Sequence, residues 1–228
     1  MRLDQARARL GARSGEFLGL LIAGDLLFIA LHLLHGYSTR FFDLGFSDPG
    51  FSLGKDRGFG EIFQYLKMFG IVLLLLGISS RAGRLSYLSW SGLFLYFLID
   101  DSFQLHERVG RVIAVRLGYT PGLSLRAKDF GELTVVVAAG LFFATVVALA
   151  WWRGGDDFRR VSKHLAMLVG LVVLFGVVLD MIHFMVKTPA VAAGLGIVEE
   201  GGEMVAMSLA CWYTYTLFLG RDRSRGSG

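Results

Sequence analysis

The chain has 228 residues, of which 54% are hydrophobic and 18% are charged. An average globular domain is about 45–50% apolar and about 25% charged. This surplus of apolar residues excludes intrinsic disorder and argues against a soluble enzyme. A single cysteine, Cys211, excludes an intramolecular disulfide and a cysteine-based metal cluster. The basic residues lie beside apolar segments, so we interpret the net charge of +4 as membrane topology and expect no nucleic-acid partner.

Six segments are apolar over about the 20 residues that a helix needs to cross a bilayer. In chain order they cover residues 17–35, 61–79, 87–105, 133–152, 165–186 and 198–219. We therefore predict an all-α fold, namely one bundle of six transmembrane helices over residues 1–228, in the inner (plasma) membrane. The first segment lacks a small-residue cleavage site and is expected to remain as an anchor.

The flanking charges predict the orientation of these six segments. Thirteen basic residues flank the ends that share one side with both termini, and nine lie on the other side. The positive-inside rule then places both termini in the cytoplasm. Of the two long outer loops, residues 36–60 are rich in glycine and aspartate, which predicts an irregular cap. Residues 106–130 begin with a stretch that fits either a short amphipathic helix at the interface or a solvated loop.

Carboxylates and histidines gather at the outer ends of the predicted helices. Three segments each carry an aspartate followed by a histidine, and the sixth segment opens with three glutamates. These residues are Asp25 with His32, Asp100 with His106, Asp180 with His183, and Glu199, Glu200 and Glu203. Ionisable groups inside a bilayer are costly and mark function by default. Carboxylates and imidazoles that project inward from several helices are how bundles build metal sites.

This pattern predicts a site for a divalent transition metal. The expected ligands are Asp100, His106, Glu107, His183, Glu199 and Glu203. The residues expected to orient them through hydrogen bonds are Asp101, Gln104, Asp180, Glu200, His32 and Asp25. Iron, manganese or zinc suits such ligands better than copper, and haem is not expected because carboxylates crowd the histidines. Lys67 is predicted to form an ion pair with the acidic cluster.

Helical geometry limits how the ligands of the third segment can act together. Asp101 and His106 lie about 100° to either side of the helix face that contains Asp100. Glu107 lies on the same face as Asp100, so one straight helix cannot point all four side chains at a single metal ion. Either some of them act only as hydrogen-bond partners of the ligands, or the helix unwinds near Gly110.

Residues 99–107, with the sequence Ile-Asp-Asp-Ser-Phe-Gln-Leu-His-Glu, resemble a motif in a family of bacterial multi-pass inner-membrane proteins of unassigned function. In that family the third span ends in Asp-acid-x-x-Gln-x-His-Glu and the last span opens with Glu-Glu-x-x-Glu-Met, matched here by residues 199–204. A Phe-Asp-Leu motif is matched by Phe42, Asp43 and Leu44, whereas a Pro-Thr-Trp stretch of the family is missing from the same loop. The resemblance implies six spans and a shared acidic and histidine site, but it implies no reaction.

Three functions fit these observations. The first is a metal-dependent membrane enzyme, a hydrolase or an oxidoreductase, that acts at the outer face. The second is a proton or cation transport or channel protein that uses the same acids, although the inner halves of the segments carry almost no polar groups. The third is a structural subunit of a larger membrane complex. The expected partners are membrane lipid and either a second copy of the chain or another membrane protein.

Known hydrolase motifs do not narrow this choice. The sequence contains no His-Glu-x-x-His motif, nucleophile elbow or Walker loop. The last segment has no histidine, which separates the chain from the intramembrane zinc hydrolases that include the alkaline ceramidases.

Overall fold

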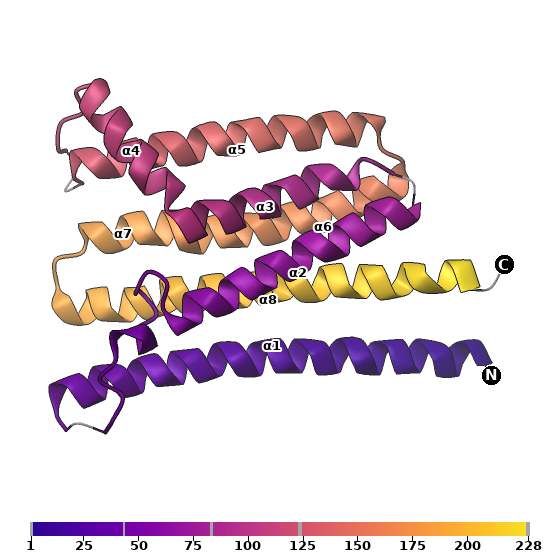
Figure 1. Cartoon of the computed structure of the whole chain (residues 1–228), viewed down its shortest axis with the longest axis horizontal. Helices are drawn as coiled ribbons and strands as arrows, with labels where there is room; N and C mark the ends of the chain where they lie inside the picture. The colour runs from indigo at the N-terminus through magenta and orange to yellow at the C-terminus, as the bar shows by residue number, and fades with distance from the viewer. Residues whose placement is uncertain (1, 43, 83, 123–124, 227–228) are drawn as a thin grey trace.

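The computed structural model describes residues 2–42, 44–82, 84–122 and 125–226, and its long helices lie side by side along one axis (Figure 1). The α-helices are α1 (Arg2–Arg40), α2 (Phe59–Ala82), α3 (Tyr87–Phe103), α4 (Leu105–Arg116), α5 (Ala127–Arg153), α6 (Asp156–Val173), α7 (Asp180–Met185) and α8 (Pro189–Gly226). A π-helical segment, η2 (Leu174–Leu179), joins α6 to α7, and a 3₁₀ helix, η1 (Pro49–Phe51), follows α1. The predicted all-α fold is confirmed, and helices cover all six predicted segments apart from a break at Gln104.

The core of the bundle lies between α2, α3, α6 and α8. On α2, Ile71, Leu75 and Ile78 are spaced by four and three residues and are fully buried, as expected for one face of a helix. They belong to the same buried cluster as Phe94 of α3 and Leu165 of α6. Helices α1 and α5 flank this core on opposite sides (Figure 1).

The outer surface of the bundle is strongly apolar. Leu20, Leu66 and Leu141 are 72%, 63% and 66% exposed, and the most apolar stretch of α5 contains no buried residue. Soluble monomers rarely expose contiguous apolar surface of this extent. The bundle is therefore compatible with burial in a membrane.

Four helices are long and apolar enough to cross a membrane within the described residues, at Gly11–Arg40, Phe59–Arg81, Ala127–Arg153 and Asp156–His183. The other two predicted spans fall short for local reasons. Helix α3 has only 17 residues, because Gln104 ends it. Helix α8 has 38 residues, but its uncharged stretch begins only after Glu203 and contains tyrosine and threonine.

Both termini lie at one end of the bundle, together with the connections from α2 to α3 and from α5 to α6 (Figure 1). Helix α4 and the connections from α1 to α2 and from α7 to α8 lie at the opposite end (Figure 1). We call this second end the loop end of the bundle. The helices that carry the predicted site residues all approach or leave the loop end.

The first long loop folds back onto the end of α1. The Nδ1–H group of His35 donates a hydrogen bond to the Phe46 carbonyl oxygen at 2.7 Å, and the Leu53 amide donates to His32 Nδ1 at 3.2 Å. Helix α1 continues to Arg40 and α2 begins at Phe59, so residues 36–40 and 59–60 of the predicted loop are helical. Apart from η1, the described residues between the two helices are irregular, as predicted. His32, predicted to orient a metal ligand, instead holds the loop.

A buried ion pair joins α1, α2 and α8 below the loop end. Lys67 Nζ lies 2.9 Å from Asp25 Oδ1, and both side chains are almost completely buried. Ser208 Oγ donates to the other Asp25 oxygen at 2.6 Å, and Lys67 also donates to the Met204 carbonyl oxygen at 2.9 Å. The paired and hydrogen-bonded charges fix the positions of three helices. The predicted ion pair of Lys67 is thus formed with Asp25, which lies deeper in the bundle than the other predicted acids.

Candidate metal centre

A break in the helix at Gln104 creates the geometry of the candidate site. Gln104 adopts a left-handed conformation, with φ 51° and ψ 46°, that ends α3 and begins α4. Asp100 stabilises the new helix start, because its Oδ1 accepts the His106 amide at 2.8 Å. This interaction satisfies one of the amide groups that have no partner at a helix N-terminus. Helix α4 continues through Gly110, so the predicted unwinding occurs six residues earlier than expected.

The break brings three ligand types together. Atoms of Asp100, Asp101 and His106 that could bind a metal ion all lie within 4.8 Å of one another. A straight helix could not achieve this, since Asp101 and His106 would point to opposite sides of Asp100. Asp100 is buried, whereas Asp101 and His106 are half-buried. Asp100 and His106 were predicted as ligands, and Asp101 as a residue that orients them.

Asp100 also fixes the orientation of the His106 ring. His106 Nδ1–H donates to Asp100 Oδ2 at 2.9 Å, which leaves Nε2 as the acceptor atom of the ring. This hydrogen bond is the main cause that raises the pKa of His106 above its ordinary value. A carboxylate that holds one ring nitrogen while the other remains able to bind a metal is typical of metal-ligating histidines.

Glu203 of α8 lines the same cavity as Asp100, Asp101 and His106. Glu203 Oε1 accepts a hydrogen bond of 3.4 Å from Gln64 Nε2. Space for the carboxylate comes from Gly176 in the π-helical segment, where an added Cβ would lie 2.7 Å from Glu203 Oε2. Single π-helical turns are frequent at functional sites.

These polar groups line one end of a cavity of about 840 Å³. Its inner part is formed by apolar residues of α3, α5, α6 and α8. Its polar end is formed by Lys55, Asp56, Glu61, Gln64, Asp100, Asp101, His106, Glu200 and Glu203. Gln64 is buried, and its Oε1 has no hydrogen-bond partner among the described residues. An unpaired buried acceptor costs about 1–3 kcal/mol. Other atoms of Gln64 line the cavity, whereas Oε1 itself is buried.

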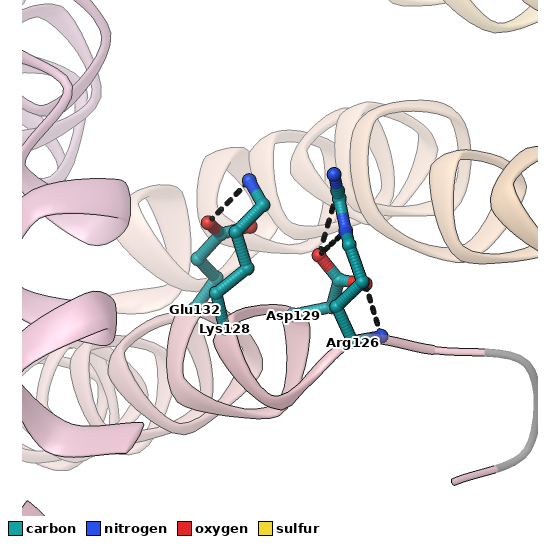
Figure 2. Close-up of polar contacts among 4 residues, drawn as sticks. All are labelled: Arg126, Lys128, Asp129 and Glu132. Carbon is teal, nitrogen blue, oxygen red and sulfur yellow. Dashed lines mark hydrogen bonds and ion pairs between the residues drawn. The ribbon is translucent and has the colours of Figure 1, made fainter. Parts of the chain in front are cut away.

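Two pairs of charged side chains hold the first turns of α5 (Figure 2). Asp129 accepts hydrogen bonds from the Arg126 amide at 2.7 Å and from Arg126 Nη2 at 2.9 Å, which caps α5. The same pairing is the main cause that raises the pKa of Arg126. Lys128 pairs with Glu132 one helical turn apart, at 3.2 Å. These contacts fix the first turns of α5, against which α4 packs.

Two glycines let α4 and α5 cross with their backbones in contact. A Cβ on Gly131 would lie 2.7 Å from the Gly110 carbonyl carbon, and a Cβ on Gly110 would lie 2.5 Å from the Glu132 amide nitrogen. Small residues at helix crossings allow this approach. The crossing helps to position the first turn of α4, which carries His106.

The remaining predicted ligands do not join this cluster. His183 Nδ1–H donates to Glu199 Oε2 at 2.8 Å, so these two residues form a separate pair between α7 and α8, with Asp180 beside Glu199. Glu107 is close enough to His106 to influence its charge, but it does not line the cavity. Glu200 does line the cavity.

The cavity also contains residues that sequence reasoning did not assign to the site. Glu61 and Gln64 line the cavity from the first turns of α2. The signal in the sequence was that both are polar residues at the start of an apolar segment. Gly176 gave no such signal, because the need for a glycine arises only from the position of Glu203 on another helix.

Comparisons with known proteins place the chain in a family. Residues 20–219 match the family described as "Domain of unknown function (DUF8692)". The chain belongs to this family. The match covers all six predicted spans except the first residues of the first one. No curated protein and no solved structure matches the chain. Asp43, in the centre of the Phe-Asp-Leu motif, lies outside the described residues.

Proposed function

We propose that the chain is a six-span inner-membrane protein that binds a divalent transition metal at the loop end of the bundle and acts there as a membrane enzyme. The metal would be held by Asp101, His106 Nε2 and Glu203, while Asp100 orients the imidazole. The observation that carries the proposal is the break at Gln104, since it gathers Asp100, Asp101 and His106 at the wall of a cavity. Iron, manganese and zinc are the metals that suit these ligands.

The donor set fits such an ion. Two carboxylates and an imidazole with an oriented second nitrogen are hard and borderline ligands, and no cysteine lines the cavity. A bound divalent ion polarises an oxygen atom of a substrate or lowers the pKa of a bound water molecule. Glu200, at the same end of the cavity, is placed to accept or return a proton.

The apolar inner part of the cavity argues against transport of protons or cations. The inner part of the cavity is lined by residues of α5 between Ala139 and Trp152 and by residues of α6 and η2 between Ala166 and Val177. None of these lining residues is ionisable. A path for protons or cations would need polar or ionisable side chains along this depth. The proposal of a metal-dependent hydrolase or oxidoreductase is therefore preferred.

Metal binding can be tested with single substitutions at the loop end. His106→Ala and Asp101→Asn should abolish stoichiometric metal binding, because each removes a direct ligand. Asp100→Asn should weaken metal affinity by about 10–100-fold, the usual cost of losing a partner that orients a ligand. Elemental analysis and metal titration of the detergent-purified variants measure both effects.

His164→Ala is the matched control. His164 is exposed on α6 and bonds to the Arg160 carbonyl oxygen, far along the helix from the loop end. Its removal should leave the metal in place. Loss of metal in the His164 variant, or its full retention in the His106 variant, would contradict the assignment of the site.

The topology part of the proposal predicts that both termini are cytoplasmic. Thirteen basic residues flank the end of the bundle that holds the termini, and nine flank the loop end. A reporter fused after Gly228 should be active only in the cytoplasm, and one inserted between residues 44 and 48 only outside it. The opposite pattern would place the candidate metal centre on the inner face.

A further inference from the structure

The inner part of the cavity lies between α5 and α6, where small residues face one another without touching. Gly140, Ala144 and Ala148 are spaced by four residues on α5, as are Ala166 and Gly170 on α6, and all five line the cavity. Such spacing ordinarily lets two membrane helices pack closely. Here a Cβ added to Gly140 or Gly170 would meet no described atom within 4 Å. The small side chains therefore widen the cavity instead of closing a helix contact.

This apolar part of the cavity is long. From Val136 to Trp152 it follows α5 over about 24 Å, at 1.5 Å per residue. That length exceeds the roughly 15 Å of hydrocarbon in one leaflet of a bilayer about 30 Å thick. A long hydrocarbon chain fits these dimensions.

The cavity is open toward the surface that the proposed topology places in lipid. Gly140, Ala144, Ala166 and Gly170 are exposed although they line it. Water at this depth would find no polar partners along the α5 and α6 walls. A hydrocarbon chain can enter from the membrane without losing an apolar environment.

The other end of the cavity specifies the head group. The carboxylates of Asp56, Glu61 and Glu200, which are not among the proposed metal ligands, line this end together with one lysine, Lys55. They accept hydrogen bonds, and their negative charges outnumber the single lysine and repel an anionic group. The polar end therefore favours a neutral or cationic head that carries donors.

We propose that the cavity binds a single-chain amphiphile whose tail lies between α5 and α6 and whose hydroxyl or ammonium head reaches the carboxylates beside the candidate metal centre. This inference names the substrate class of the enzyme proposed above and rests on that function for any reaction. Binding of the chain itself does not require the metal.

Photolabelling of the full-length protein in phosphatidylcholine vesicles tests the proposal. The probe is hexadecanol with a diazirine in the middle of the chain, and labelled peptides are mapped by mass spectrometry. Labelling should saturate and concentrate on residues 136–152 and 166–177. Unlabelled hexadecanol and hexadecylamine should compete, whereas palmitate, with the same chain but an anionic head, should compete at least about tenfold less well.

Two substitutions to leucine provide the matched comparison. Gly140→Leu fills part of the cavity and should displace about two methylenes of the chain, which lowers apparent affinity about tenfold or more. Gly19→Leu on α1 should have no effect, because Gly19 also has open space around its Cα but does not line the cavity. Competition by the unlabelled compounds is measured on the unaltered chain, so it does not depend on the folding of a variant.

The proposal is overturned if labelling is unsaturable and equal on α1 and α5, if palmitate competes as well as hexadecanol, or if Gly140→Leu changes nothing. Metal content of the same preparation separates this inference from the proposed function. Bound metal without saturable labelling contradicts the amphiphile alone, and saturable labelling without metal contradicts the metal centre alone.

Discussion

Replacing Lys67 by Met is expected to destabilise the bundle by about 3–5 kcal/mol, the cost of leaving one buried charge without its partner. Lys67 Nζ contacts Asp25 at 2.9 Å, and both side chains are almost completely buried. The substitution keeps most of the volume of the lysine but leaves Asp25 with only the Ser208 hydroxyl. Reversible unfolding in mixed micelles of dodecylmaltoside and sodium dodecyl sulfate measures the loss.

The double variant Lys67→Met/Asp25→Leu separates the cost of an unpaired charge from the cost of lost packing. Apolar replacement of both partners of a buried pair is often neutral. The double variant should therefore recover most of the stability that Lys67→Met loses. A double variant that is less stable than Lys67→Met would show that the pair itself, and not the unpaired Asp25, determines the stability.

Gly131→Ala is expected to produce the second large loss, about 3 kcal/mol, at the upper end of the range for overpacking. Its Cβ would lie 2.7 Å from the carbonyl carbon of Gly110, so that the backbones of α4 and α5 must separate. Because α4 carries His106 in its first turn, the same variant should also bind metal more weakly. Unfolding in mixed micelles and metal titration read out the two effects independently.

Gly140→Ala is the matched control on the same helix. The added methyl group meets no described atom within 4 Å, and alanine is favoured over glycine inside a helix by about 1 kcal/mol. This variant should be as stable as the unaltered chain or slightly more stable. If Gly131→Ala were equally harmless, the close crossing of α4 and α5 would be refuted.

The positions of the helices could be predicted from the sequence because each apolar segment has the length of a membrane span. For the stretch that begins residues 106–130, a short helix and a solvated loop were both open. The structure shows a helix there, α4. The break at Gln104 could not be predicted, since a left-handed glutamine leaves no compositional signal. Gly110 was the expected point of unwinding because glycine is flexible, but its missing side chain serves the contact with Gly131 instead.

The candidate site was only partly predictable because sequence gives the depth of a residue along its helix but not the direction in which it faces. Asp25 and Asp100 both precede a histidine in a segment that runs toward the loop end, yet Asp25 faces Lys67 and Asp100 faces His106. The pair of His183 with Glu199 has the expected depth and residue types, but it lies apart from the cavity. Asp100, Asp101 and His106 were all assigned to the site, but their convergence depends on the break at Gln104.

Elemental analysis of the purified, unaltered protein tests the metal centre most directly. Protein produced in metal-replete medium and purified in detergent without chelators should contain about one or two ions of iron, manganese or zinc per chain, as carboxylate and histidine sites in helix bundles do. The same protein with His106→Ala should contain none. A folded, monodisperse preparation of the unaltered chain that contains no stoichiometric transition metal would contradict the metal centre and the enzyme built on it.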